Sequence, residues 1–496
     1  MSKYIVALDS GTTGNKAIAF DLQGNIAAYS YTEFPQIFPK SGWVEQNPYD
    51  ILNSALKVLK DVIEKVGVEN VLALGITNQR ETTILWDKET GEPLYNAIVW
   101  QCRRSAEICE RLSDNKNMIK DKTGLFLDPY FSATKVIWLN ENIEKVRNLI
   151  SKGNVLLGTV DSWLLYNLTS DKLHLTDITN ASRTMFFNIN TLDYDRDLLK
   201  LFEIPDYILP EVKPSGANFG VIDKKYFGKE IPITAVIGDQ QSALFAHGGW
   251  REGLIKNTYG TGLFLMTSTK NNIFKSNNLI STVAWQIEDD VEYALEGSVF
   301  IGGSLVQWLR DNLNLIEKSP DIEHIAANVE NSNGVYIVPA FSGIGAPYWD
   351  HSARGVIIGI TRGTTKEHIA RAALEAIAFQ VKDIFEELRK DTKIEFKTLS
   401  VDGGASENRL LLQIQADMLG LSVEKTTVKE STAFGAAALA GIVAGVWDKS
   451  DILKIREIEY IFNPDKDYHY YQKSYKVWKE AVKRSLGWGS FINTLE

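Results

Sequence analysis

The sequence predicts an α/β protein made of two related lobes with a cleft between them. Its 496 residues exceed the roughly 150 residues of a typical domain, which favours two or more folded units. The hydrophobic content of 44% suffices for large buried cores and excludes a disordered chain. A strand, a Gly/Thr-rich turn and a second strand occur at 4–20 and recur at 253–267. Such a repeat in a chain of this length favours two lobes of similar construction.

The first half begins with three predicted strands. YIVALD (4–9) is an apolar run that ends in an aspartate and predicts a strand. SGTTGN has the residue types of a turn, and KAIAFDL predicts the second strand. A third strand follows the QGN turn and reaches residue 31. Apolar residues at helical spacing predict a helix over 49–65, and NVLALGITN (70–78) predicts a further strand. The block 103–150 is predicted to be largely helical.

The second half alternates predicted helices with strands. ITAVIGD is an apolar strand that ends in Asp239, and the strand–turn–strand of 253–267 follows. Thr364 and Glu367 have the spacing of a capping box that opens a long helix. DGGASEN (402–408) joins a strand to a helix that runs from Arg409 to Gly420. We place the lobe boundary near residue 245, which gives lobes of 1–245 and 246–496.

Charge and cysteine content exclude several classes of function. With 53 basic and 63 acidic residues the net charge is −10, which argues against nucleic acid and anionic lipid as partners. Cys102, Cys109 and six scattered histidines form neither a disulfide framework nor a zinc cluster. Without a secretory signal at the start of the chain, we expect a cytoplasmic protein. The uncharged stretch 431–447 is shorter than the ~20 residues of a membrane-spanning helix, so we expect a buried helix and no membrane insertion.

Two glycine-rich turns are candidates for binding phosphate. In the first, between Asp9 and Lys16, glycines let successive N–H groups approach an anion, and Thr12, Thr13 and Lys16 add donors. The acid at the strand end could hold Mg²⁺. The second turn is Tyr259–Gly262. Each could be an ordinary hairpin, but two such turns from matching positions would clamp a polyphosphate from both sides.

Three further clusters carry polar residues at strand ends. Asp239 and Gln240 follow a strand at the carboxyl edge of the sheet, where ligands of open α/β sheets bind. A carboxylate there could accept the proton of an alcohol in phosphoryl transfer, or could simply cap the next helix. Arg80 and Glu81 could hold the hydroxyls of a polyol or form a surface salt bridge. The DGGASEN segment joins a strand to a helix. Its backbone could lie flat against a nucleobase, or the segment could be an ordinary loop that caps the helix.

These segments resemble the FGGY family of carbohydrate kinases. The matching motifs include DSGTTGNKA, GWVEQNP, NQRETT, NAIVWQCRR, DPYFSATK, GDQQSALF, KNTYGTG, GAPYWD, GVIIGITRGTTKEHIARAALEA and VDGGASEN. They are collinear from residue 4 to about 445. NQRET, DPYF and GDQQ are the parts that favour glycerol over sugars as the acceptor.

The resemblance implies two actin-like (ribonuclease-H-like) lobes with a catalytic cleft between them. It implies direct in-line transfer of the ATP γ-phosphoryl group to glycerol, giving sn-glycerol 3-phosphate, with ATP and Mg²⁺ as cofactors. The first lobe would hold glycerol and the first phosphate hairpin, and the second lobe the nucleotide and the second hairpin. The resemblance implies glycerol contacts at Arg80, Glu81, Tyr130, Asp239 and Gln240, with Trp100 and Phe264 against the carbon skeleton. It implies Asp239 as the catalytic base, nucleotide contacts at Thr12, Thr13, Thr261, Gly303, Gln307, Gly404 and Asn408, and metal contacts at Asp9 and Asp239.

One departure from the family pattern lies in the first hairpin. The family usually reads DQGTTSSR, whereas this chain has Ser10, Gly14, Asn15 and Lys16. Gly14 and Asn15 remove hydroxyls that could contact phosphate, and Lys16 replaces a forked guanidinium with a point charge. We still expect ATP binding, with Lys16 as a nucleotide contact.

Two other functions stay open at this point. One is an FGGY kinase for another polyol or a sugar such as a pentulose. The other is an actin- or Hsp70-like ATPase that acts on protein partners, although no appendage for such partners follows residue 450. The sequence leaves the oligomeric state open, and a homodimer is the common arrangement.

Overall fold

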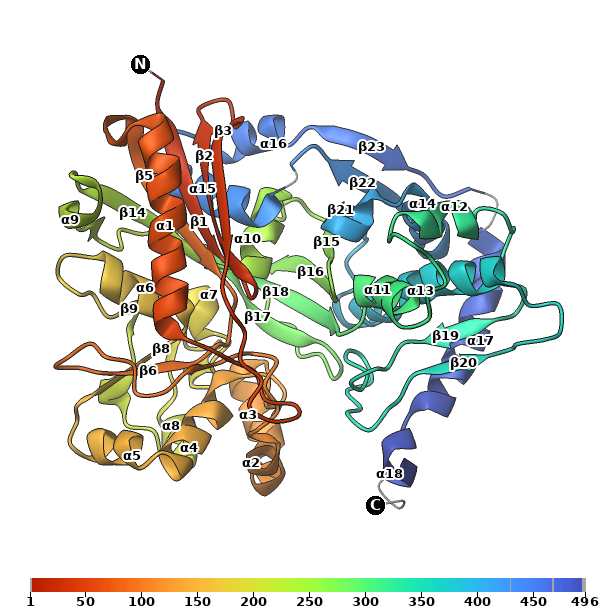
Figure 1. Ribbon diagram of the computed structural model, residues 1–496, viewed down its shortest axis with the longest axis horizontal. Helices are drawn as coiled ribbons and strands as arrows, with labels where there is room; N and C mark the ends of the chain where they lie inside the picture. The colour runs from red at the N-terminus through yellow and green to blue at the C-terminus, as the bar shows by residue number, and fades with distance from the viewer. Residues whose placement is uncertain (1, 429, 466–467, 493–496) are drawn as a thin grey trace.

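The computed structural model describes residues 2–428, 430–465 and 468–492. Figure 1 shows two α/β lobes side by side, the first in red to yellow-green and the second in green to blue. Each lobe is built around one mixed β-sheet. The two sheets have the same central arrangement of strands, which is the repeat that the sequence predicts.

The first sheet has the strand order β13-β14-β5-β1-β2-β3. Strands β1 (Tyr4–Ser10), β2 (Gly14–Asp21) and β3 (Ile26–Glu33) form an antiparallel meander. Strands β5 (Val71–Asn78) and β14 (Ile231–Gly238) extend the sheet in parallel from β1, and β13 (Val221–Ile222) is antiparallel to β14. The predicted strands over 4–31 and 70–78 are confirmed.

Two helices cover the faces of the first sheet. Helix α1 (Pro48–Val66) packs on β2 and β3 and begins at the N-cap Asn47, whose side chain accepts a hydrogen bond from Tyr49 N–H. Helix α15 (Ser431–Val443) packs on β1, β5 and β14, although it comes from the second half of the chain. Gly75 permits this close approach, because a Cβ there would lie 2.2 Å from the Ala436 carbonyl oxygen. The expected buried helix of small residues is therefore confirmed.

The second sheet has the order β17-β18-β16-β15-β21-β22-β23. Strands β15 (Leu254–Tyr259), β16 (Leu263–Lys270) and β18 (Asp290–Val299) form the antiparallel part, which β17 (Ile280–Ile287) extends. Strands β21 (Thr398–Asp402) and β22 (Ser422–Thr426) continue in parallel from β15, and β23 (Ile458–Phe462) is antiparallel to β22. The turns β1–β2 and β15–β16 thus occupy equivalent places in the two sheets.

The remaining elements surround these sheets. In the first half they are β4 (Glu45–Gln46), β6 (Ile84–Asp87), β7 (Ala97–Ile98), α2 (Ala106–Arg111), α3 (Lys116–Thr123), α4 (Ser132–Asn142), α5 (Glu144–Ser151), β8 (Val155–Gly158), α6 (Val160–Leu168), β9 (Leu175–Asp177), α7 (Ile178–Ala181), β10 (Phe187–Asn188), β11 (Asp193–Tyr194), α8 (Arg196–Phe202), β12 (Glu211–Lys213) and α9 (Lys224–Phe227). In the second half they are α10 (Asp239–Ala246), α11 (Gly303–Asp311), α12 (Asp321–Ala326), β19 (Tyr336–Val338), β20 (Val356–Ile358), α13 (Lys366–Thr392), α14 (Arg409–Leu419), α16 (Lys449–Ile455), α17 (Tyr468–Ser485) and α18 (Trp488–Ile492).

One predicted helix start is wrong by one residue. Helix α13 has Thr365, not Thr364, at its N-cap, and the third helical position is His368 instead of Glu367. The His368 ring nitrogen accepts a hydrogen bond from Thr365 N–H at 3.1 Å. Both threonines suit the N-cap position. The His368 imidazole makes the hydrogen bond to the N-cap backbone that is expected of the Glu367 carboxylate.

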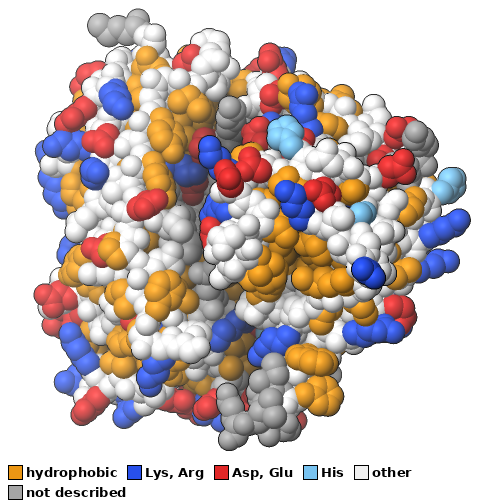
Figure 2. All heavy atoms as spheres, turned by 45° about the vertical axis from the view of Figure 1, so that its right-hand side comes forward, with side chains coloured by type: hydrophobic (Ala, Val, Ile, Leu, Met, Phe, Trp, Pro, Cys, Tyr) orange, Lys and Arg blue, Asp and Glu red, His pale blue; other side chains and the backbone are white. Residues whose placement is uncertain are grey.

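Among the described residues, the structure contains no helix that is both long and apolar enough to cross a membrane. A furrow separates the two lobes on the face shown in Figure 2, and acidic and basic side chains gather along it.

Candidate active site

A buried cluster of four charged side chains lies where the lobes meet. Arg80, just after β5, donates from its two terminal nitrogens to Glu296 of β18, at 2.6 and 3.1 Å. Arg183 donates to Glu296 at 3.1 Å and to Glu81 at 2.6 Å. All four side chains are at most 2% exposed. Two guanidinium groups and two carboxylates therefore balance one another out of contact with water.

The electrostatics of the cluster favour the fully charged form of Glu296. Although burial alone would raise the pKa of Glu296, the Arg183 and Arg80 guanidiniums lower it to about 2. The pKa of Glu81 is raised by its burial, against the opposing effect of Arg183 and Arg80. Glu81 also has a positive φ of 61°, an uncommon backbone conformation for a residue other than glycine. Arg80 and Glu81 are predicted from the sequence, whereas Arg183 and Glu296 belong to no motif that would predict them.

Asp239 begins helix α10 directly after β14, as the sequence predicts. Its Oδ1 lies 3.1 Å from Arg80 Nε, and its side chain is 28% exposed. The Gln240 N–H donates to the same oxygen at 2.7 Å. Loss of surrounding water raises the pKa of the Asp239 carboxyl, while Arg80 opposes that rise. The result is a partly accessible carboxylate that can accept a proton.

Gln240 is fixed by a buried lysine. Lys256 of β15 donates from Nζ to Gln240 Oε1 at 2.7 Å, and both side chains are buried. Burial lowers the pKa of Lys256 from its usual value, and the carboxylates of Asp402 and Asp239 counteract this. Since the carbonyl oxygen of Gln240 is engaged, its amide nitrogen is left as the group that can donate to a ligand.

Three aromatic side chains form a wall that spans both halves of the chain. Trp100 makes an edge contact with Tyr130 at 5.6 Å between ring centroids and with Phe264 of β16 at 6.4 Å. The Arg183 guanidinium lies 5.6 Å from the centroid of the Tyr130 ring. The aromatic residues predicted to contact a carbon skeleton are thus neighbours, next to the charge cluster.

The aromatic wall also connects the two glycine-rich turns. Trp100 Nε1 donates to Thr12 Oγ1, in the turn after β1, at 2.9 Å. Phe264 lies on β16 just after the second turn and pairs in register with Thr258 of β15. Thr13 is exposed in the first turn, and its hydroxyl lies 3.4 Å from Tyr31 OH.

Lys16 is engaged by two acids. Its Nζ lies 2.8 Å from Glu430 Oε2, just before α15, and 3.5 Å from Asp9 Oδ2. Asn15 points to the other side of the sheet, where Nδ2 donates to the carbonyl oxygen of Ile51 in α1 at 2.6 Å. The hydroxyl that Asn15 replaces would therefore face α1, so the expected loss of a phosphate contact at this position is wrong. Strand alternation separates the two side chains.

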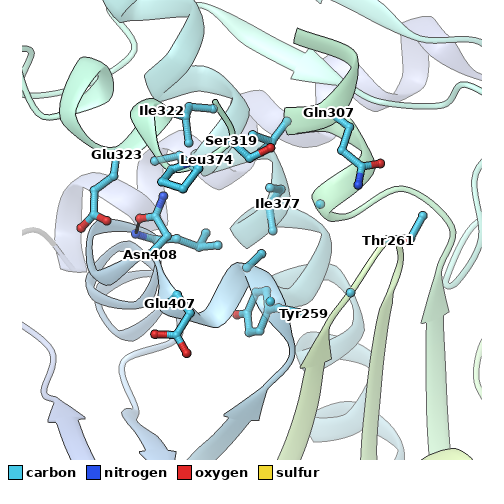
Figure 3. Close-up of a pocket in the computed structure, with 17 residues that line it drawn as sticks. Tyr259, Thr261, Gln307, Ser319, Ile322, Glu323, Leu374, Ile377, Glu407 and Asn408 are labelled. Atoms are coloured by element: carbon cyan, nitrogen blue, oxygen red, sulfur yellow. Dashed lines mark hydrogen bonds between the residues drawn. The ribbon is translucent and has the colours of Figure 1, made fainter. Parts of the chain in front are cut away.

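A cavity of about 400 Å³ lies in the second lobe (Figure 3). Its lining includes five predicted nucleotide contacts, which are Thr261, Gly303, Gln307, Gly404 and Asn408. Ile322, Leu374 and Ile377 supply apolar surface of the kind that suits a planar base. The other predicted nucleotide contacts do not line this cavity and lie instead in the first lobe; they are Thr12, Thr13 and Lys16.

The loop before α14 is shaped to bring backbone close to this cavity. Gly403 has a φ of 88°, and a Cβ there would lie 2.5 Å from the Tyr259 carbonyl oxygen. Asn408 caps α14 by accepting from Leu411 N–H at 2.8 Å through Oδ1. Its amide nitrogen is left as the donor toward a ligand.

Asp9 and Asp239 are the candidate metal ligands. Asp9 is 4% exposed at the end of β1, and its charge helps to raise the pKa of Asp239, so the two carboxylates lie within electrostatic reach of each other. The described residues contain no group of three or more His, Cys, Asp or Glu side chains arranged to hold a metal. Two carboxylates that act together with nucleotide phosphates fit Mg²⁺, which prefers oxygen ligands and keeps several waters.

Comparison with known proteins gives matches over nearly the whole chain. The N-terminal domain model of the FGGY family of carbohydrate kinases matches residues 4–246, and its C-terminal domain model matches 255–444. The chain is 51% identical over 492 residues to "Glycerol kinase 2" of Thermotoga maritima, covering 98% of this chain and 99% of that protein. It is 52% identical over 486 residues to "Glycerol kinase" of Aquifex aeolicus, covering 98% and 99%.

Solved structures show the same fold. The crystal structure of Plasmodium falciparum glycerol kinase with ADP superposes with a TM-score of 0.91 at 38% identity, covering 98% of each chain. A gluconate kinase from Lactobacillus acidophilus gives a TM-score of 0.89 at 24% identity, covering 99% of this chain and 100% of the other, a likeness of fold alone. The predicted fold class, two actin-like α/β lobes, is confirmed.

Proposed function

Because the chain belongs to the FGGY family of carbohydrate kinases, we propose that it transfers the γ-phosphoryl group of ATP to glycerol, giving sn-glycerol 3-phosphate and ADP. The observation that carries this proposal is the partly exposed Asp239 carboxylate, 3.1 Å from Arg80 Nε, next to an aromatic wall. The relatives that are about half identical to this chain are named glycerol kinases.

Glycerol would bind between the charge cluster and the aromatic wall. Arg80 would donate to one hydroxyl and Glu81 would accept from another, while the Gln240 amide and the Tyr130 hydroxyl add further polar contacts. Trp100 and Phe264 would pack against the carbon skeleton. A three-carbon polyol has apolar CH faces and hydroxyl edges, and this site offers surfaces to match both.

Asp239 would act as the general base. Its carboxylate accepts the proton of the attacking hydroxyl as the new O–P bond forms and the bond between the γ-phosphorus and the bridging oxygen breaks, which leaves ADP. The raised pKa of Asp239 makes it a better proton acceptor than an ordinary aspartate. No covalent enzyme intermediate is needed in this direct transfer.

The nucleotide would lie with its base in the 400 Å³ cavity and its phosphates between the two glycine-rich turns. Gly404 and Asn408 would contact the base end, and Thr12, Thr13, Lys16 and Thr261 the phosphates. Asp9 and Asp239 would hold Mg²⁺, which neutralises phosphate charge when it is bound. The −10 net charge of the chain does not oppose this, because the neutralising groups are local.

We extend the proposal to three further points. The lobe boundary lies near residue 245, the protein works in the cytoplasm, and a homodimer is the arrangement to test first. The two cysteines are free, which agrees with a reducing compartment.

The experiment is a coupled assay of ADP release with ATP, Mg²⁺ and a panel of acceptors. We expect the highest kcat/KM with glycerol. A higher value with a pentulose or gluconate would replace glycerol as the substrate. ADP release at the same rate without any acceptor would instead favour an ATPase that acts on protein partners.

A further inference from the structure

Glu296 lies on a strand of the second sheet but makes its main contacts with the first lobe. It is 0% exposed in β18, and its partners Arg80 and Arg183 come from the loops after β5 and α7. The next residue, Gly297, holds the strand against α13, because a Cβ there would lie 2.3 Å from an Ile384 side-chain carbon. The backbone that carries Glu296 is therefore closely packed.

Both carboxylate oxygens of Glu296 are engaged. Oε2 accepts from Arg80 Nη1 at 2.6 Å, and Oε1 accepts from Arg80 Nη2 and Arg183 Nη2, each at 3.1 Å. Ser298 Oγ also donates to Oε1, at 3.0 Å. Gln241 Oε1 accepts a second bond from Arg80 Nη1 at 3.0 Å. Both terminal nitrogens of Arg80 are thus engaged by Glu296 and Gln241, while Asp239 Oδ1 lies 3.1 Å from Nε.

We propose that Glu296 is a positioning residue for the phosphoryl transfer: it holds Arg80 by both terminal nitrogens and so keeps them from pairing with the Asp239 carboxylate. This inference rests on the proposed function. It assigns a role in glycerol phosphorylation to a residue that touches neither glycerol nor ATP directly.

The physical reason lies in the geometry of arginine–carboxylate pairs. A guanidinium prefers to meet a carboxylate with two parallel N–H···O bonds. If Glu296 did not occupy the terminal nitrogens, Arg80 could turn and form such a fork with Asp239. The fork would engage both oxygens of Asp239 and make it a poorer proton acceptor.

Glu296 also maintains the charge balance of the site. Without its charge, two buried guanidiniums would face only Glu81 and Asp239. Removing Glu296 would therefore leave the two terminal nitrogens of Arg80 free to pair with the Asp239 carboxylate.

The test is Glu296→Gln, which keeps the size of the side chain and removes its charge. We expect kcat for glycerol phosphorylation to fall at least ten-fold, while the KM for ATP changes little. A residue that only stabilised the fold would lower the unfolding temperature without lowering the kcat of the folded enzyme.

Glu292→Gln is the matched control. Glu292 lies on the same strand, is 5% exposed, accepts from Ser268 Oγ at 2.6 Å and lies 3.5 Å from Lys270 Nζ, but it contacts none of the predicted site residues. We expect this variant to keep the wild-type kcat. Glu296→Asp is a second variant, which keeps the charge but shortens the reach to Arg80, and its kcat should lie between those of the wild type and Glu296→Gln.

The inference is overturned if Glu296→Gln keeps the wild-type kcat, or if Glu292→Gln lowers kcat by the same factor. If Glu296→Gln does not fold, wild-type kcat in Glu296→Asp overturns it. The wild-type enzyme is measured in the same series. Absence of glycerol-dependent ADP release there would remove the proposed function itself, which is a separate outcome.

Discussion

The ammonium of Lys256 donates to the carbonyl oxygen of Gln240 at 2.7 Å, and both residues are buried. Lys256 comes from the central strand of the second sheet, whereas Gln240 follows the proposed base at the end of the first sheet. A contact between the lobes therefore determines which end of the Gln240 amide faces the site.

Lys256→Met should raise the KM for glycerol about ten-fold with a smaller change in kcat. A hydrogen bond to a charged group contributes about 1.5–3 kcal/mol, and its loss frees the Gln240 amide to rotate. Steady-state kinetics with glycerol as the varied substrate measures this. Lys382→Met is the control, since Lys382 is also buried but pairs with Glu386 on α13. Equal KM values in the two variants would contradict the role of Lys256.

Trp100→Phe should weaken ATP binding more than glycerol binding. The variant keeps an aromatic ring against Tyr130 and Phe264 but loses the hydrogen bond from Nε1 to Thr12 Oγ1. Because a neutral hydrogen bond contributes about 1 kcal/mol, we expect the KM for ATP to rise several-fold. An unchanged KM for ATP would show that the orientation of Thr12 does not matter for the nucleotide.

Asn408 has two separable roles, which a pair of variants can distinguish. Asn408→Ala removes the cap of α14 and should lower the free energy of unfolding by about 1 kcal/mol, as well as raise the KM for ATP. Asn408→Asp keeps the oxygen that accepts from Leu411 N–H but loses the amide donor. It should therefore keep its stability in urea unfolding while the KM for ATP still rises. Wild-type KM in Asn408→Asp would exclude the amide as a nucleotide contact.

Glu296 should make the folded protein sensitive to acid. Its pKa is lowered from 4.5 to about 2 in the folded protein. A group with a depressed folded-state pKa contributes stability that is present above pH 4.5 and is lost as pH falls from there toward 2. Denaturant unfolding between pH 7 and pH 3 should show this loss, and Glu296→Gln should show less of it. An identical pH dependence in both proteins would contradict the assigned charge state.

The sequence predicts the parts of the fold that depend on local pattern. Alternating apolar runs and glycine turns predict the hairpins of both sheets, and Asp239 stands out because it follows a strand directly. Glu296 and Arg183 could not be found in this way. Glu296 lies in a strand segment, ALEGSV, whose neighbours carry no motif, and its function depends on how the chain brings positions 80, 183 and 296 together.

The same limit explains two errors of detail. Thr364 and Thr365 have equal capping chemistry, so the local pattern does not decide which of them begins α13. Asn15 and Lys16 are adjacent in the sequence, but strand alternation directs Asn15 toward α1 and Lys16 toward Asp9. A motif read residue by residue does not reveal on which face each side chain lies.

The most direct test of the central claim is glycerol-dependent ADP release by the wild-type protein and by Asp239→Asn at saturating substrates. The amide keeps the shape of the side chain but cannot accept the proton. We predict rapid release that requires glycerol in the wild type, and a kcat lower by about 10²–10⁴-fold in the variant, with glycerol binding largely retained. A variant that keeps near-normal kcat would contradict the assignment of Asp239 as the base.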